Sequence, residues 1–320
     1  MTERIDISKR LADGELLLLD GGTGSELQRR GISVSRGVSE ANGATLGAWS
    51  ATAMEDAPEV VRAIHEDYLR VGADIITANS YNTNRGQLGA VGLAHRMEEF
   101  SRLAIELARQ ARDRMNPNAY VAGAIAPTNR FPQGWDPSRV PPREELLREW
   151  GDQAAVLADA GADLILIETM SAIFQLQPAV EVAKATGLPV FLGIHATPQG
   201  TMSSGETMEQ LVEALKGMEP EAILLMCRPP QDVSATLPNL RAAFDGPIGA
   251  YANIGYGKSK EPTRWQYHNI DIGHNTPVHY AQFAQAWIDM GAQIIGGCCA
   301  TTPEHIAALC PLVKREAIGS

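Results

Sequence analysis

Three stretches of the chain, LRVGADIIT at residues 69–77, LADAGADLIL at 157–166 and WIDMGAQIIG at 287–296, repeat one pattern. In each stretch an amphipathic segment ends at a glycine and an apolar run follows. Glycine is the usual residue just past a helix C-terminus, because it adopts the left-handed backbone conformation at little cost. The repeat therefore predicts, at three places along the chain, a helix that leads directly into a strand.

Apolar runs with the length of buried parallel strands recur along the whole chain, and we count eight of them. They are Leu16 to Asp20, Asp74 to Thr77, Tyr120 to Ile125, Leu164 to Glu168, Val190 to Ile194, Ala222 to Cys227, Ile248 to Tyr251 and Ile294 to Gly297. Amphipathic segments lie between them, such as Pro58 to Val71, Arg96 to Arg114, Arg143 to Ala160, Met208 to Met218 and Pro277 to Met290. This alternation predicts a (β/α)8 TIM barrel, formed as a single domain by residues 1–320. The alternative is an open doubly wound sheet, but the first turn, DGGTG at 20–24, lacks the phosphate-binding fingerprint with which that fold commonly starts.

The amino-acid composition and net charge limit the kinds of molecule that the protein is expected to bind. The 320 residues are 44% hydrophobic and 20% charged, and the net charge is −11. Nucleic acids and anionic membranes bind basic surfaces, so both are disfavoured and a small-molecule partner is favoured. Residues 1–14 contain no apolar stretch long enough for a signal peptide, and no run reaches membrane-spanning length. We therefore expect a cytoplasmic protein.

Cysteines carry the sharpest chemical signal. The chain has four, too few for a disulfide framework in a protein of this length. Cys227 ends the sixth predicted strand and Cys298 with Cys299 follow the eighth, and the carboxyl ends of barrel strands converge on the catalytic face. An isolated cysteine is often only a small buried apolar residue, which is how we interpret Cys310. Three thiolates around Zn²⁺ leave one tetrahedral position open, and a thiol bound there loses its proton.

Four segments resemble a known family. They are LLLLDGGTGSEL at 16–27, GADIITANSY at 72–81, ADLILIET at 162–169 and IIGGCCATTPEHI at 294–306. Together they resemble the homocysteine S-methyltransferases over nearly the whole chain. The resemblance implies a (β/α)8 barrel with Cys227, Cys298 and Cys299 as zinc ligands, and an enzyme that methylates the sulfur of L-homocysteine to give methionine.

The resemblance also implies which residues bind the amino acid end of homocysteine. Asp20 and Glu168 would grip the ammonium group, an assignment consistent with the strength of charge-assisted hydrogen bonds. The backbone at Gly21 and Gly22 would approach the substrate carboxylate, which suits residues without a Cβ atom. The alternatives are that Asp20 is a turn or helix-cap residue and that Glu168 is a partner in an ion pair at the barrel rim.

Further polar residues fall at the predicted strand ends. The resemblance implies that Asn79 and Asn253 either bind substrate or orient a loop. The sequence does not decide between these two roles for either residue. We interpret His195 as a hydrogen-bonded strand-end residue rather than a ligand. Met226 departs from the family, whose members often have asparagine before the first zinc cysteine.

Two long connections, 31–57 and 254–276, carry aromatic residues that predict a site for a small cationic methyl donor. Trp49 and Trp265 are the candidates for a cation–π contact with it. The chain is shorter than expected of the betaine enzymes and has Thr169 where they have tyrosine, so a sulfonium donor is favoured over a quaternary ammonium. The alternative is a thiol-binding module that works with a separate cobalamin protein. Loop aromatics favour the free-standing enzyme; they are Trp49, Tyr81, Tyr256, Trp265 and Tyr267.

Overall fold

A computed structural model describes residues 4–34, 36, 48–127, 141–255 and 272–314. The strands are β1 (Leu17–Leu18), β2 (Ile75–Thr77), β3 (Tyr120–Ile125), β4 (Leu164–Met170), β5 (Val190–Ile194), β6 (Ala222–Met226), β7 (Ile248–Ala252) and β8 (Ala292–Gly297). The α-helices are α1 (Ile7–Ala12), α2 (Thr23–Arg29), α3 (Ala53–Asp56), α4 (Pro58–Arg70), α5 (Arg85–Gly89), α6 (Met97–Met115), α7 (Arg143–Asp159), α8 (Ile173–Lys184), α9 (Met208–Ala214), α10 (Pro230–Ala243), α11 (Pro277–Asp289) and α12 (Pro303–Val313). Two short 3-10 helices are η1 (Trp49–Thr52) and η2 (Ala94–Arg96).

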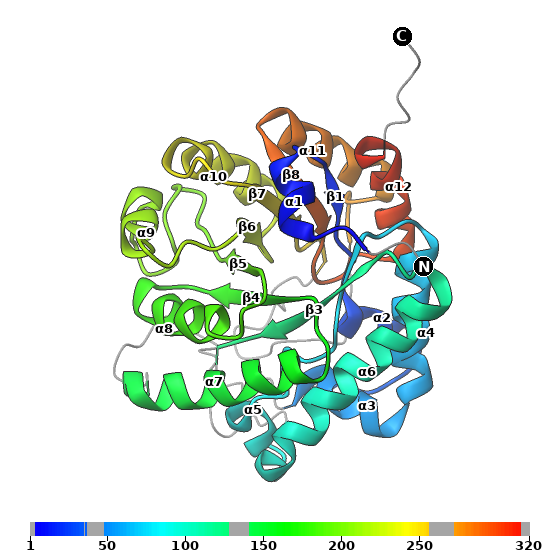
Figure 1. Cartoon of the computed structure of the whole chain (residues 1–320). Helices are drawn as coiled ribbons and strands as arrows, with labels where there is room; N and C mark the ends of the chain where they lie inside the picture. Colours follow the sequence, from blue (N-terminus) through cyan, green and yellow to red (C-terminus); the bar gives the residue numbers. More distant parts are fainter. Residues whose placement is uncertain (1–3, 35, 37–47, 128–140, 256–271, 315–320) are drawn as a thin grey trace.

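The eight strands form one parallel sheet that closes on itself. Their order is β1-β8-β7-β6-β5-β4-β3-β2, and a parallel bridge between Leu19 and Ile75 joins the two ends. The helices surround the strands as an outer ring (Figure 1). Closure confirms the predicted (β/α)8 barrel and excludes the open doubly wound sheet.

The repeated helix-glycine-strand units have the predicted conformation. Gly72 follows α4, Gly161 follows α7 and Gly291 follows α11, with φ angles of 105°, 95° and 94°. A side chain is strained at these angles, so glycine is needed where each helix turns back toward its strand.

The predicted strands are all present, and their ends differ by a few residues. The first is regular only at Leu17–Leu18, where the Leu18 N–H donates to Asp74 Oδ2 at 3.0 Å instead of to a neighbouring strand. The fourth runs on to Met170, past the predicted end at Glu168. Asp6 accepts hydrogen bonds from the backbone of Ser8 and Lys9 and so caps α1, a helix that the apolar runs do not predict.

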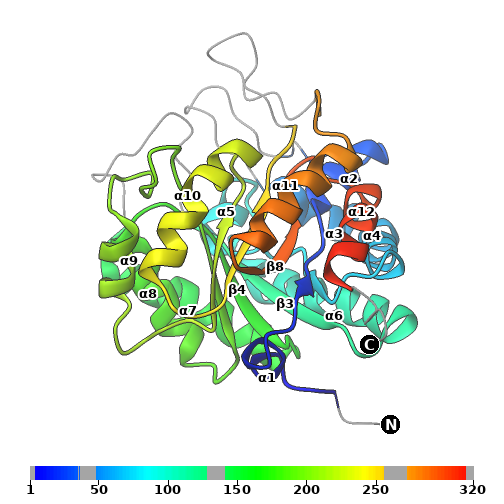
Figure 2. The same ribbon diagram turned by 90° about the horizontal axis from the view of Figure 1, so that it is seen from above.

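The core has two layers. Between sheet and helices lies the larger cluster, and inside the barrel lies a smaller one that includes Leu19, Leu166, Phe191 and Tyr251. Ile7 and Leu11 of α1 belong to the inner cluster, so α1 closes one end of the barrel (Figure 2). At the other end, Cys227 and Cys298 pack partly buried against the same cluster. The interior is thus filled, and chemistry is confined to the carboxyl ends of the strands.

None of the helices in the described part of the chain combines the length and apolar character that a membrane span requires.

Candidate metal centre and substrate site

The three predicted cysteines converge. Cys227 Sγ lies 3.7 Å from Cys299 Sγ, and Cys298 Sγ lies 3.9 Å from Cys299 Sγ. All three sulfur atoms lie within 4.8 Å of one another, and each residue is partly buried. Among the described residues, these three cysteines form the group of side chains that lie close enough together to bind one metal ion.

The sulfur positions fit a zinc ion. Zn–S bonds of about 2.3 Å at tetrahedral angles separate two sulfur ligands by about 3.8 Å. The distances of Cys299 Sγ from the other two sulfur atoms, 3.7 and 3.9 Å, bracket that value. Three sulfur ligands complete three corners of a tetrahedron and leave the fourth for a substrate, as in catalytic rather than structural sites.

Backbone conformation makes this convergence possible. In a strand, successive side chains point to opposite faces, so two adjacent cysteines cannot share a target while the strand continues. β8 ends at Gly297, and Cys298 and Cys299 lie in the turn before α12. Cys227 and Ala300 have positive φ angles, 50° and 68°. Non-glycine residues in this region are strained, and such residues concentrate at functional sites.

The sulfur atoms are not equivalent electrostatically. Hydrogen-bond contacts with the thiols of Cys298 and Cys299 hold the pKa of Cys227 well below its usual range, and His195 acts in the same direction. Burial raises the pKa of Cys298 well above its usual value. A cluster of this kind readily gives up one proton, and a cation would favour loss of the others.

His195 lies at the end of β5 and its side chain faces Cys227. Its backbone N–H donates to Met170 O at 3.0 Å, as expected of a strand-end residue. Its Nε2 atom, however, is buried and has no hydrogen-bond partner among the described residues. The His195 side chain also acts on the Cys227 thiol, so His195 is a neighbour of the candidate metal centre.

Asp20 lies at the end of β1 and is 2% exposed. The Thr77 N–H and Oγ1 both donate to its carboxylate, at 2.7 and 2.9 Å. Burial raises its pKa to about 7, and the hydrogen bonds from Thr77 oppose that rise. Asp20 is thus a buried carboxyl poised between its two protonation states near neutral pH.

Glu168, on β4, is 8% exposed. The Tyr251 hydroxyl lies 3.1 Å from both Glu168 Oε1 and Met226 Sδ. Burial, and secondarily the charge of Glu168, raise the pKa of Tyr251 well above its usual value, so this phenol stays protonated and donates. Tyr251 therefore positions Glu168 from inside the barrel, a role that it did not have in the sequence analysis, and Met226 lies against the same hydroxyl.

The predicted asparagines hold loops. Asn79 Oδ1 accepts from the Ser50 hydroxyl at 2.6 Å, and Asn79 Nδ2 donates to Ser50 O at 2.8 Å. Asn253 Oδ1 accepts from the Gly255 N–H at 3.1 Å, and its own N–H donates to Arg228 O at 2.9 Å. These contacts favour the loop-orienting role for both residues, while contact with substrate stays a prediction.

Gly21 and Gly22 lie where the β1 and β8 loops meet. A Cβ atom on Gly22 would lie 2.6 Å from Cys298 O, and one on Gly21 would lie 2.8 Å from Thr301 Oγ1. The Gly22 N–H donates to Thr301 Oγ1 at 3.2 Å. Close approach of the two loops is thus sufficient reason for both glycines, and their approach to a substrate carboxylate stays a prediction.

The two donor candidates are placed differently. Trp49 is 9% exposed, and its indole lies against Gly24 of α2. That contact favours a packing role, and donor binding by Trp49 stays a prediction. Trp265 lies outside the described residues.

A closed (β/α)8 barrel that gathers three cysteines where its strands end has the architecture of a barrel enzyme with a thiolate-ligated metal. The family model described as homocysteine S-methyltransferase matches residues 17–313. The chain therefore belongs to the homocysteine S-methyltransferase family, and it is an enzyme that transfers a methyl group to the sulfur of homocysteine.

Individual relatives agree with this assignment. The chain is 28% identical to the homocysteine S-methyltransferase of Escherichia coli (strain K12), over 97% of this chain and 99% of the relative. It is 27% identical to homocysteine S-methyltransferase 1 of Arabidopsis thaliana, over 95% of each. The metallated form of the E. coli homocysteine methyltransferase MmuM superposes with a TM-score of 0.79 at 25% identity, over 98% of this chain and 100% of that structure.

Proposed function

We propose that Cys227, Cys298 and Cys299 bind Zn²⁺, that homocysteine sulfur takes the fourth position, and that the methyl donor is a small sulfonium compound. The observation that carries the proposal is the separation of the three Sγ atoms, 3.7 and 3.9 Å for two pairs, at the carboxyl end of the barrel. The reducing conditions that free thiols require favour the cytoplasm as the place of action.

When bound, Zn²⁺ lowers the pKa of a coordinated thiol so that it is deprotonated at neutral pH. No side chain is then needed as a general base. The substrate sulfur attacks the methyl carbon, the bond between that carbon and the donor sulfur breaks, and the electron pair leaves with a neutral thioether. The protein contributes by holding the two substrates in line, and such positioning is worth roughly 7–11 kcal/mol.

The amino acid end of homocysteine binds, on this proposal, between Asp20 and Glu168. Both are buried acidic side chains at strand ends, each held by a hydroxyl donor, from Thr77 and Tyr251 respectively. Buried carboxylates form strong hydrogen bonds to an ammonium group. A buried carboxylate that lacks a cationic partner destabilises the folded protein. The pair therefore supports binding of an α-amino acid with its sulfur directed at the cysteines.

Glu168→Gln tests this assignment. We expect the KM for homocysteine to rise tenfold or more, because removing the charged partner of an ammonium group costs about 1.5–3 kcal/mol. Zinc content should stay at the wild-type value. Glu221→Gln is the matched control, because Glu221 lies at the opposite end of the barrel, where it pairs with Lys184 and accepts from the Val190 N–H. Equal KM values for Glu168→Gln and wild type would contradict the assignment.

A comparison of donors tests the reaction. Purified zinc-containing enzyme is assayed at one concentration with S-methylmethionine, dimethylsulfoniopropionate, S-adenosylmethionine and betaine, and methionine is measured. We expect a sulfonium donor to give the highest kcat/KM. Methyl transfer from none of the four would contradict a free-standing enzyme and favour the alternative, a module that works with a cobalamin protein. That alternative is not favoured, because relatives matched along almost their whole length are themselves named methyltransferases.

A further inference from the structure

The residue that follows the two adjacent cysteines has an unusual conformation. Ala300 is completely buried and has a φ angle of 68°. For a residue other than glycine, this left-handed conformation is strained, because the Cβ atom comes too close to the following carbonyl oxygen. It occurs where the chain turns sharply to let Cys298 and Cys299 face the same point, their Sγ atoms 3.9 Å apart. Something outside the turn must hold it there.

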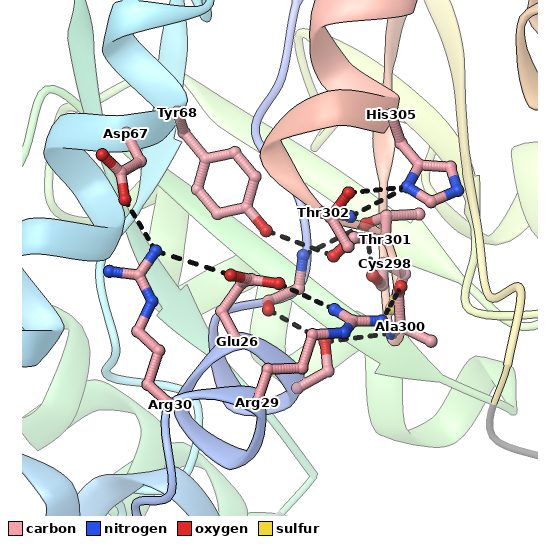
Figure 3. A network of polar contacts seen from close by, with 12 residues as sticks. Glu26, Arg29, Arg30, Asp67, Tyr68, Cys298, Ala300, Thr301, Thr302 and His305 are labelled. Carbon is pink, nitrogen blue, oxygen red and sulfur yellow. Dashed lines mark hydrogen bonds and ion pairs between the residues drawn. The ribbon is translucent and has the colours of Figure 1, made fainter. Parts of the chain in front are cut away.

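Helix α2 holds both backbone groups of Ala300. The Ala300 N–H donates to Ser25 Oγ at 3.0 Å. The Ala300 carbonyl accepts from Arg29 Nη2 at 2.6 Å (Figure 3). Ser25 and Arg29 are four residues apart and lie on one face of α2. They reach Ala300 across 275 and 271 positions of sequence. The turn formed by Cys298, Cys299 and Ala300, here called the cysteine turn, is therefore held by residues from near the other end of the chain.

The two holding residues are themselves fixed. The Ser25 hydroxyl donates to Gly22 O at 2.9 Å. Arg29 Nη1 donates to Glu26 Oε1 at 2.7 Å, and Glu26 is 6% exposed. A buried acceptor on one side and a backbone carbonyl on the other leave the Arg29 guanidinium little freedom to rotate.

We propose that Ser25 and Arg29 are positioning residues of the metal centre: they hold Ala300 in its left-handed conformation and thereby fix Cys299 Sγ relative to the other two sulfurs. This inference rests on the proposed zinc site. Neither residue lies within the cysteine cluster, so their role is to orient ligands and not to bind metal.

The chain offers a matched control in Arg30. Its side chain is 27% exposed and that of Arg29 is 28% exposed, and both are paired with Glu26. Arg30 turns to Asp67 at 2.6 Å, whereas Arg29 reaches Ala300 (Figure 3). Arg29→Met and Arg30→Met therefore remove the same charge from adjacent positions, the last residue of α2 and the C-cap that follows it, and only the first releases the cysteine turn.

The test measures the zinc affinity of wild type, Ser25→Ala, Arg29→Met and Arg30→Met by competition with a chelator. Ser25→Ala and Arg29→Met should bind zinc roughly 10–100-fold more weakly, the usual effect of losing a residue that orients a ligand. Arg30→Met should stay within about twofold of wild type. In Co²⁺-substituted protein, the thiolate-to-metal absorption bands should change for the first two variants only. Thermal unfolding of each metal-free variant shows whether the fold is intact, and Ser25→Ala decides the matter if Arg29→Met does not fold.

A second change separates conformation from general packing. Glycine adopts a positive φ angle without strain, so Ala300→Gly in the Arg29→Met background should restore part of the zinc affinity. Equal zinc affinities of Arg29→Met and Arg30→Met, or no recovery with Ala300→Gly, would overturn the inference. A wild-type protein that binds no zinc would instead overturn the proposed metal site, so the two failures are distinguishable.

Discussion

Cys298→Ala and Cys299→Ala are each expected to remove bound zinc and to abolish methyl transfer. Each sulfur atom lies as far from a neighbouring sulfur as two ligands of a tetrahedral zinc ion do. All three cysteines are therefore needed to bind the metal. Two remaining thiolates do not complete the shell, and the thiol substrate would then keep its proton at neutral pH. Zinc per protein chain, from elemental analysis, and methionine formation measure the two effects.

The control for this experiment is Cys310→Ala. Cys310 lies on α12 against Gly72, a part of the barrel away from the three clustered sulfurs, and its role is packing. We expect full zinc occupancy and wild-type activity in this variant. Stoichiometric zinc in Cys298→Ala, or loss of zinc in Cys310→Ala, would show that the metal is held elsewhere.

The fold follows from the sequence because its signals are local. Gly72, Gly161 and Gly291 mark helix ends within a few residues of the strands they precede, and buried parallel strands are continuous apolar runs. The helix α1 is the exception. Its two buried residues, Ile7 and Leu11, are apolar because they pack against the end of the barrel that α1 closes. Two apolar residues in so short a segment are too few to show a helical period in the sequence.

The site is predictable where the barrel itself brings residues together. Strand order alone places Cys227 beside Cys298 and Cys299, since β6, β7 and β8 are neighbours. Contacts that depend on side-chain direction are not predictable in this way. The pairing of Asn79 with Ser50, and the grip of Ser25 and Arg29 on Ala300, join segments that no sequence pattern relates. The first favours the loop-orienting role for Asn79, one of the two roles that the sequence leaves open, and the second is the basis for the proposed positioning role of Ser25 and Arg29.

The second large effect concerns Asp20 and pH. Its pKa near 7, raised by burial, means that part of the free enzyme carries a protonated Asp20 at neutral pH. Only the carboxylate attracts an ammonium group strongly. We therefore expect kcat/KM for homocysteine, which reports the free enzyme, to fall about tenfold per pH unit below pH 7. Bound substrate stabilises the carboxylate, so the corresponding fall in kcat should begin at lower pH.

Asp20→Asn separates this titration from proton competition at the sulfur ligands. The variant should lose affinity for homocysteine, keep its zinc, and lose the inflection near pH 7 that wild type shows in kcat/KM. Zinc content, measured at each pH, identifies any part of the profile that comes from metal release. An inflection that persists unchanged in Asp20→Asn would assign it to another group.

The same variant should be at least as stable as wild type, which a purely structural carboxylate would not allow. The folded-state pKa of Asp20, about 7, lies above its unfolded value of 3.8. The folded protein therefore holds the proton more tightly, and stability is lost as pH rises from about 4 to 7, by at most about 4 kcal/mol. Asparagine carries no charge to bury, so the melting temperature of Asp20→Asn should equal or exceed that of wild type at pH 8, and the difference should shrink toward pH 5. A buried carboxylate that binds an ammonium group is expected to destabilise the free protein until the ligand is bound. A large fall in melting temperature at pH 8 would therefore show that Asp20 stabilises the fold instead.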